Sequence, residues 1–131
     1  MELSVIVADD DPIIQDLIAD CLADLGVVIR KAATGSQVLK ILKELTPALI
    51  ILDIYMPGLN GLKVATAVRA TPQWANIPIL ILTAYGDRRT LARAVEAGAN
   101  DFMVKPFTIE VLQEKARKLL NPWPEPLEAS A

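Results

Sequence analysis

The sequence predicts an α/β domain built around a parallel β-sheet. Five short apolar runs alternate with five stretches in which apolar residues recur at helical spacing, a pattern typical of repeated βα units. The chain has 131 residues, of which 53% are hydrophobic, and this is enough for one sizeable core. Polar or charged residues end four of the apolar runs. In a parallel sheet these residues lie along the edge where open α/β folds place their binding sites.

The first half of the chain contains three apolar runs that predict strands, Leu3–Ala8, Val27–Ala32 and Ala48–Leu52. Gly26 ends the helix between the first two, and Pro47 ends the helix between the second and the third. The predicted buried face of the first helix consists of Ile14, Leu17, Ile18, Cys21, Leu22 and Leu25. The predicted buried face of the second helix consists of Val38, Leu39, Ile41, Leu42 and Leu45.

The second half of the chain continues the same alternation. Ile77–Leu82 is an unbroken apolar run, as expected for a strand covered on both faces, and Phe102–Val104 is a short fifth strand. Thr108 is the predicted N-cap of the last helix. The predicted buried faces of the last three helices are Leu62, Val64, Ala65 and Val68; Leu91, Ala94 and Val95; and Val111, Leu112, Ala116, Leu119 and Leu120. Residues 1–120 therefore form the predicted domain, and 121–131 form a proline-rich C-terminal tail or the start of a linker.

The composition of the chain excludes several classes of function. The net charge is −3 and Lys and Arg form no cluster in the sequence, so we expect a protein partner, with no direct binding to nucleic acid or to a membrane. The absence of His removes imidazole metal ligands and Ser-His-Asp triads. Cys21 is the single cysteine and is interpreted as a core residue. The chain opens without a signal peptide, which predicts a cytoplasmic protein.

The residues at the ends of the apolar runs predict a site. Asp9 and Asp10 follow the first run, and Asp53 follows the third. We expect the three carboxylates to converge with the Thr83 hydroxyl and the Lys105 ammonium, which end the fourth and fifth runs. Clustered carboxylates repel one another, and a hard cation such as Mg²⁺ relieves that repulsion. The predicted metal ligands are Asp10 and Asp53, with Asp9 acting through water.

Four segments resemble the receiver domains of bacterial response regulators, the signalling proteins of two-component systems. They are V-A-D-D-D-P, I-I-L-D-I-Y-M-P-G, I-L-I-L-T-A and F-M-V-K-P-F, and they stand in the order of that family at four strand ends. The resemblance spans about residues 3–120. It implies a flavodoxin-like (βα)₅ fold with a doubly wound parallel sheet in strand order 2-1-3-4-5. It also implies a switch that works through an aspartyl phosphate.

The resemblance assigns a chemical role to each residue of the predicted site. Asp53 is the phosphoacceptor, and the backbone carbonyl of Tyr55 is a further Mg²⁺ ligand. Lys105 offsets the negative charge that develops on the phosphoryl oxygens, and a cis peptide bond to Pro106 aims its side chain. The phosphoryl donor is a sensor histidine kinase or a phosphotransfer protein. The receiver catalyses only its own phosphorylation and dephosphorylation, so we do not class it as an enzyme.

The resemblance also implies how the signal is relayed. The Thr83 hydroxyl and the backbone N–H of Ala84 donate hydrogen bonds to the phosphoryl group, and Phe102 swings inward as Thr83 moves. The readout face is then formed by the fourth helix, the fifth strand and the fifth helix. The downstream target is an unknown protein, and a phosphorylation-dependent homodimer is compatible with this scheme. Bulky Tyr55 and Tyr85 flank the phosphoryl site, which predicts slow access of water and a long-lived phosphorylated state.

Plainer interpretations stay open beside these roles. Asp11 precedes Pro12 at a helix start and is interpreted as an N-cap, with metal binding as its alternative. Phe102 is either a simple core residue or the moving aromatic residue. For the whole chain, the alternatives are a pseudo-receiver that binds partners without phosphorylation and a haloacid-dehalogenase-type phosphatase. The phosphatase has a D-x-D motif such as Asp9 and Asp11 form, but Ile13 replaces the Thr or small residue that follows it there.

Overall fold

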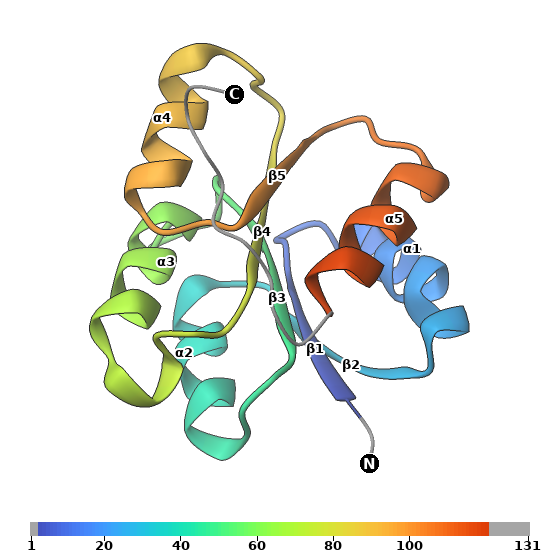
Figure 1. The fold of residues 1–131 in the computed structure, drawn as a ribbon, viewed down its shortest axis with the longest axis horizontal. Coiled ribbons are helices and arrows are strands. Elements are labelled where there is room, and N and C mark those ends of the chain that lie inside the picture. Colours follow the sequence, from blue (N-terminus) through green and yellow to red (C-terminus); the bar gives the residue numbers. More distant parts are fainter. Residues whose placement is uncertain (1–2, 121–131) are drawn as a thin grey trace.

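Five parallel strands form one central sheet in the order β2-β1-β3-β4-β5 (Figure 1). The computed structural model describes residues 3–120, and the tail expected over 121–131 lies outside these described residues. The strands are β1 (Leu3–Ala8), β2 (Val27–Ala32), β3 (Leu49–Asp53), β4 (Ile79–Thr83) and β5 (Asp101–Val104). The predicted flavodoxin-like, doubly wound topology is therefore confirmed, with its switch point between β1 and β3.

Helices cover both faces of this sheet (Figure 1). One face carries α1 (Pro12–Leu22) and α5 (Ile109–Leu119), and the other carries α2 (Gly35–Glu44), α3 (Gly61–Ala70) and α4 (Arg88–Glu96). Alternate strand residues point to opposite faces, so each face has its own apolar core. In β1, for example, Val5 and Val7 pack with residues of α1 and α5, whereas Ile6 and Ala8 pack with residues of α2 and α3. None of the helices among residues 3–120 combines the length and the apolar content needed to cross a membrane.

The central strands end one residue later than the apolar runs predict. Every residue of β3 and β4 is buried, which explains why their sequences show no alternation. Asp53 is the last residue of β3 and is paired in register with Leu82, and Thr83 is the last residue of β4 and is paired with Val104. The backbones of both residues are thus fixed by the sheet. Their side chains stand at its carboxyl edge.

The buried face of α1 differs from the predicted one. Leu17 is 41% exposed, and Leu25 belongs to a separate 3₁₀ turn over Ala23–Leu25. The buried positions begin with Gln15, which shares a face with Ile18 and Leu22 because residues three and seven apart align on a helix. The helix begins as predicted, since the Asp11 carboxylate accepts a hydrogen bond from the Ile13 N–H at 2.9 Å.

Candidate functional site

Three carboxylates meet at the carboxyl edge of the sheet. Asp9 directly follows β1, Asp10 comes next, and Asp53 ends β3. One carboxylate oxygen from each of the three lies within 4.8 Å of the others. Asp9 and Asp53 are buried, whereas Asp10 is exposed, so the cluster is open to solvent on the Asp10 side. The structure therefore brings together the three acids that the sequence analysis placed in one site.

Lys105 supplies the positive charge of the cluster. Its Nζ lies 2.7 Å from Oδ2 of Asp9 and 3.6 Å from Oδ1 of Asp53. It comes directly after β5, where its backbone N–H donates to the carbonyl of Thr83 at 2.8 Å and its peptide bond to Pro106 is cis. Three carboxylates against one ammonium leave a formal charge of −2, which one divalent cation would balance.

Burial and charge shift the protonation equilibria of this cluster. Burial, followed by the repulsion of Asp9, raises the pKa of Asp53 to about 6, and attraction to Lys105 and a backbone hydrogen bond from Tyr55 oppose that rise. Burial by itself lowers the pKa of Lys105, but its hydrogen bond with Asp9 and its attraction to Asp53 outweigh burial, so the pKa is raised. At neutral pH, Asp53 is therefore mostly ionised and Lys105 is protonated.

A buried glutamine, which the sequence analysis missed, holds the loop that carries Asp9. Gln15 Nε2 donates to the backbone carbonyl of Asp9 at 2.6 Å and to that of Ala32 at 3.0 Å. Ala32 also accepts the backbone N–H of Asp9 at 3.0 Å, so α1, β1 and β2 are joined at this point. One signal was available in the sequence. Gln15 is a polar residue at helical spacing from the buried Ile18 and Leu22.

Gly61 allows the loop after Asp53 to turn back toward the strand. Its N–H donates to the carbonyl of Ile54 at 2.8 Å, and a Cβ on Gly61 would collide with the carbonyl oxygen of Asp53. Asn60 caps the helix that starts here by accepting the Lys63 N–H at 3.0 Å. The chain thus packs glycine backbone directly against Asp53. A larger residue at position 61 would displace the backbone of Asp53.

The Thr83 hydroxyl is bound within its own loop. It accepts the N–H of Tyr85 at 2.9 Å and donates to the carbonyl of Tyr85 at 3.2 Å, and the Thr83 side chain is buried. Ala84, between them, is exposed. Phe102 on β5 is half-buried against the core of the α2–α4 face, and Lys115 Nζ lies 5.8 Å from its ring centroid. Phe102 therefore has core contacts, and its movement stays a prediction.

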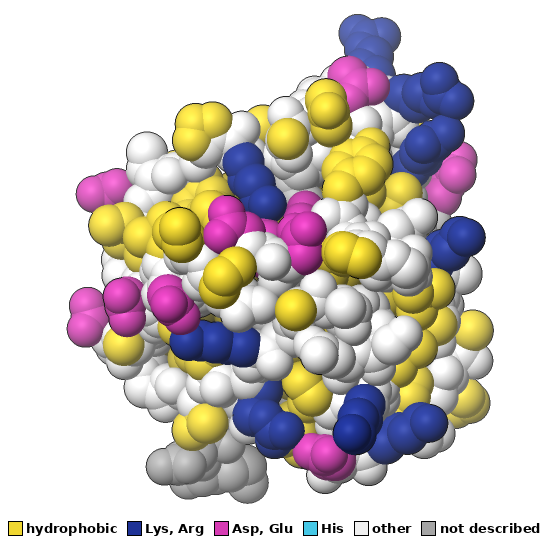
Figure 2. All heavy atoms as spheres, turned by 180° about the vertical axis from the view of Figure 1, so that it is seen from behind, with side chains coloured by type: hydrophobic (Ala, Val, Ile, Leu, Met, Phe, Trp, Pro, Cys, Tyr) yellow, Lys and Arg dark blue, Asp and Glu magenta, His cyan; other side chains and the backbone are white. Residues whose placement is uncertain are grey.

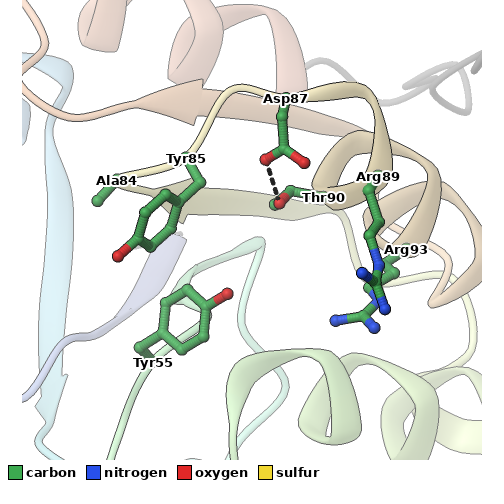
Figure 3. Close-up of a pocket in the computed structure, with 7 residues that line it drawn as sticks. All are labelled: Tyr55, Ala84, Tyr85, Asp87, Arg89, Thr90 and Arg93. Atoms are coloured by element: carbon green, nitrogen blue, oxygen red, sulfur yellow. Dashed lines mark hydrogen bonds between the residues drawn. The ribbon is translucent and has the colours of Figure 1, made fainter.

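Two tyrosines, each two residues after a strand-end residue of the site, line one side of a cavity. The rings of Tyr55 and Tyr85 meet edge to face, with centroids 5.6 Å apart and an interplanar angle of 84° (Figure 3). They are 55% and 58% exposed. The cavity has a volume of about 630 Å³, and besides the two tyrosines it is lined by Ala84, Asp87, Arg89, Thr90 and Arg93.

Comparison with known proteins finds one family over most of the chain. The response regulator receiver domain matches residues 5–117. The chain is 33% identical over 120 residues to the chemotaxis protein CheY of Pseudomonas aeruginosa, a match that covers 91% of this chain and 97% of that protein. It is 34% identical over 117 residues to the DNA-binding dual master transcriptional regulator RpaA of Synechocystis sp., covering 89% of this chain and 48% of that protein.

Solved structures give the same result. The chemotaxis response regulator CheY4 of Vibrio cholerae superposes with a TM-score of 0.85 at 28% identity, covering 91% of this chain and 99% of the other. The receiver domain of NtrX from Brucella abortus superposes with a TM-score of 0.82 at 30% identity, covering 91% and 99%. The chain spans about half the length of its DNA-binding relatives RpaA and MtrA.

Proposed function

The chain belongs to the response regulator receiver domains, and from this membership we propose that it is a phosphorylation-dependent switch with Asp53 as the phosphoacceptor. The donor is a phosphohistidine on a sensor histidine kinase or a phosphotransfer protein. The observation that carries the proposal is the cluster at the sheet edge, in which a buried carboxylate with a raised pKa lies between two further carboxylates and one ammonium. Clusters in which burial and charged neighbours shift the pKa values of titratable groups are characteristic of reactive sites.

The acidic cluster has the donor set that Mg²⁺ prefers. Its ligands are oxygens and its formal charge of −2 matches a divalent ion. Asp10 and Asp53 would bind the ion directly, together with the backbone carbonyl of Tyr55. Both oxygens of Asp9 already accept hydrogen bonds, from the Asp11 N–H at 2.9 Å and from Lys105 at 2.7 Å, which supports a contact through water. When bound, Mg²⁺ would supply positive charge to neutralise the phosphoryl oxygens.

Phosphoryl transfer to Asp53 breaks one bond and forms another. A carboxylate oxygen of Asp53 attacks phosphorus, the P–O bond forms, and the P–N bond to the donor imidazole breaks as that ring takes up a proton. Lys105 keeps its proton and stabilises the charge on the phosphoryl oxygens, and the Thr83 hydroxyl and the Ala84 N–H donate to them. Because the pKa of Asp53 is about 6, the attacking carboxylate is available at neutral pH.

The proposed switch starts at Thr83. When its hydroxyl turns to the phosphoryl group, the two hydrogen bonds to Tyr85 are lost and Phe102 moves inward. The face formed by α4, β5 and α5 changes and is recognised by a downstream protein. Phosphorylation shifts this equilibrium only as far as its contacts differ between the two states. Receiver domains of this kind act in the cytoplasm, and dimerisation of the phosphorylated form is compatible with the scheme.

Intact mass after incubation with acetyl phosphate tests the proposal directly. We expect one added phosphoryl group on the wild type in the presence of Mg²⁺, and none in EDTA or in the Asp53→Asn variant, with circular dichroism showing that every sample is folded. A folded wild type that takes up no phosphoryl group would contradict the proposal. That result would favour a module that binds partners without phosphorylation.

Substituting Gln15 by Leu is expected to weaken Mg²⁺ binding by about tenfold or more, because groups that orient metal ligands typically contribute factors of this size. Gln15 holds the backbone of Asp9, and its loss leaves that loop free to move. Isothermal titration calorimetry with Mg²⁺ measures the effect. Gln113→Leu is the matched control, because Gln113 Nε2 makes the same kind of bond to the carbonyl of Cys21, at 2.8 Å. Equal weakening in both variants would contradict a role in positioning.

Substituting Tyr55 and Tyr85 together by Ser is expected to shorten the half-life of the phosphorylated state by about tenfold, equivalent to about 1.4 kcal/mol of barrier. The two rings meet edge to face beside Asp53 and limit the access of water. Loss of the adduct is followed by intact mass after removal of acetyl phosphate. The double Tyr→Phe variant keeps both rings and should keep the half-life. An unchanged half-life in the Ser variant would overturn the idea.

A further inference from the structure

We propose that the cavity bounded by Tyr55, Tyr85 and α4 binds an acidic segment of a partner protein, with Arg89 and Arg93 as its anchors. The cavity has a volume of about 630 Å³, in the range of specific binding sites. None of its residues belongs to the Asp9, Asp10, Asp53 and Lys105 cluster. Tyr55, Ala84 and Tyr85 also flank the proposed phosphoryl site, whereas Arg89 and Arg93 have no role in it. Substituting the two arginines therefore tests recognition without removing a group from the chemistry proposed at Asp53.

The two arginines concentrate positive charge on one wall. They lie four residues apart on α4 and therefore on the same helical face, where like charges repel each other. Figure 3 shows both arginine side chains on the α4 side of the cavity, across from the tyrosines. Among residues 3–120, neither has a carboxylate within ion-pairing distance. A carboxylate from a partner would relieve the repulsion and accept paired hydrogen bonds.

The acid that lines this cavity, Asp87, forms no ion pair with either arginine. Asp87 also lines the cavity, but its Oδ1 accepts a hydrogen bond from Thr90 Oγ1 at 2.6 Å, as the dashed line in Figure 3 shows. That bond, more than any other contact, lowers the pKa of Asp87. Asp87 is also the N-cap residue of α4, where the helix dipole favours its charge. The Asp87 carboxylate thus interacts with the start of α4 and does not act as a counter-ion for the two arginines.

The opposite wall is aromatic. The rings of Tyr55 and Tyr85 are more than half exposed and line the cavity on the side away from the arginines in Figure 3. Tyrosine and arginine are the residue types enriched at the centres of protein interfaces, because both combine apolar area with polar groups. An aromatic or large apolar residue in the partner segment would pack on these rings while its acids meet the arginines.

A second hollow shares Arg93 with this cavity, and two neighbouring hollows favour an extended peptide over a compact anion. Arg93 also lines a neighbouring space of about 420 Å³ between α3 and α4, together with Asn60, Leu62, Lys63, Thr66, Glu96 and Ala97. Lys63 adds a cation along this path, and Glu96 adds an acid that the partner must avoid. After the half-turn from Figure 1, α4 lies at the upper right of Figure 2, where basic side chains gather. This local positive charge contrasts with the net charge of −3 of the chain.

The cavity wall is linked to the switch, a step that rests on the proposed function. Tyr85 is held by its two backbone hydrogen bonds to Thr83, at 2.9 and 3.2 Å. When Thr83 turns to a phosphoryl group on Asp53, Tyr85 loses both bonds and this wall of the cavity moves. The cavity as described has both bonds in place, so we expect the partner segment to bind this form more tightly and phosphorylation to release it.

The test starts with a phage library of short random peptides selected on the wild-type protein. We expect the enriched peptides to carry several acids and one aromatic or large apolar residue. The consensus peptide, labelled with fluorescein, is then titrated by fluorescence anisotropy. The double substitution R89Q/R93Q should weaken its binding by about tenfold or more, as for other anchor residues. The matched control K40Q/K43Q removes the same charge from exposed positions of α2, outside the α4–β5–α5 face, and should leave binding unchanged.

Several results would overturn the proposal. They are failure to enrich any sequence, enrichment of basic or uncharged sequences, and equal weakening by the two double variants. The titration is repeated after acetyl phosphate treatment, with the adduct measured by intact mass, and we expect about fivefold weaker binding or more. Unchanged affinity with a complete adduct would overturn the link to Thr83. Absence of an adduct would count against the proposed function. The effect of R89Q/R93Q on untreated protein would still decide whether the cavity binds the peptide.

Discussion

Replacing Lys105 by Met is expected to slow phosphorylation of Asp53 by about 10²–10³-fold, the cost of removing one well-placed charged donor from a transition state. The same change should tighten Mg²⁺ binding. The Lys105 ammonium lies 2.7 Å from Asp9 and 3.6 Å from Asp53, so it competes with a metal ion for these acids. Without it, the formal charge of the cluster changes from −2 to −3. The two effects have opposite signs, and this separates a chemical role from simple loss of structure.

The rate of adduct formation with acetyl phosphate and the calorimetric Mg²⁺ affinity measure the two effects on the same samples. Lys31→Met is the matched control, because Lys31 makes an equally short ion pair, at 2.6 Å, with the exposed carboxylate of Asp16. Exposed pairs contribute little, so we expect both quantities to change by less than about twofold in the control. Weaker Mg²⁺ binding in Lys105→Met would show that the substitution had damaged the site itself.

The residues that meet in the candidate site could be predicted from the sequence because one rule places them. Asp9, Asp53, Thr83 and Lys105 all stand where an apolar run ends, and parallel strands align those ends on one edge. The strand boundaries were less predictable. Asp53 and Thr83 belong to their strands because sheet hydrogen bonds continue past the last apolar residue, and hydrophobicity does not report hydrogen bonds.

The residues that support the site could not be predicted in the same way. Gln15 acts through carbonyl groups 6 and 17 residues away, and such bonds leave no periodic trace in the sequence. Arg69 is similar: it donates to the carbonyls of Ala75, Ile77 and Gly98 and to the side chain of Asn100. In sequence it is an ordinary arginine at the end of an amphipathic helix. Only the packed arrangement of the chain shows what it binds.

The acidic cluster places function in conflict with folding. Packing Asp9 and Asp53 together out of water raises the free energy of the folded state, and Lys105 offsets only part of this cost. A chain selected for stability alone would have a neutral side chain at position 53. The conflict would suit the proposed switch, because Mg²⁺ or a phosphoryl group would act on a site whose charges are already unbalanced. It also has a measurable consequence.

Substituting Asp53 by Asn is expected to stabilise the metal-free protein by about 3 kcal/mol at neutral pH. The pKa of Asp53 is about 6 in the folded protein against an ordinary value of 3.8, and one pKa unit corresponds to about 1.36 kcal/mol. The folded state holds its proton more tightly than the unfolded state, so stability falls as the pH rises from about 4 to about 6. Asn carries no charge, so the stability of the variant does not fall over this pH range. Its excess free energy of unfolding over the wild type should therefore shrink to about 1 kcal/mol at about pH 4.5.

Urea denaturation in EDTA at the two pH values measures this difference. Saturating Mg²⁺ should narrow the stability difference between variant and wild type at neutral pH. The ion stabilises the folded wild type, and the variant lacks the Asp53 carboxylate as a ligand. Asp20→Asn removes the same charge from an exposed position of α1 and should change stability by less than about 0.5 kcal/mol at either pH. If Asp53→Asn were no more stable than the wild type at neutral pH in EDTA, then burial of Asp53 would not carry the cost inferred from its raised pKa. If the advantage persisted unchanged in acid, its cause would be packing rather than charge.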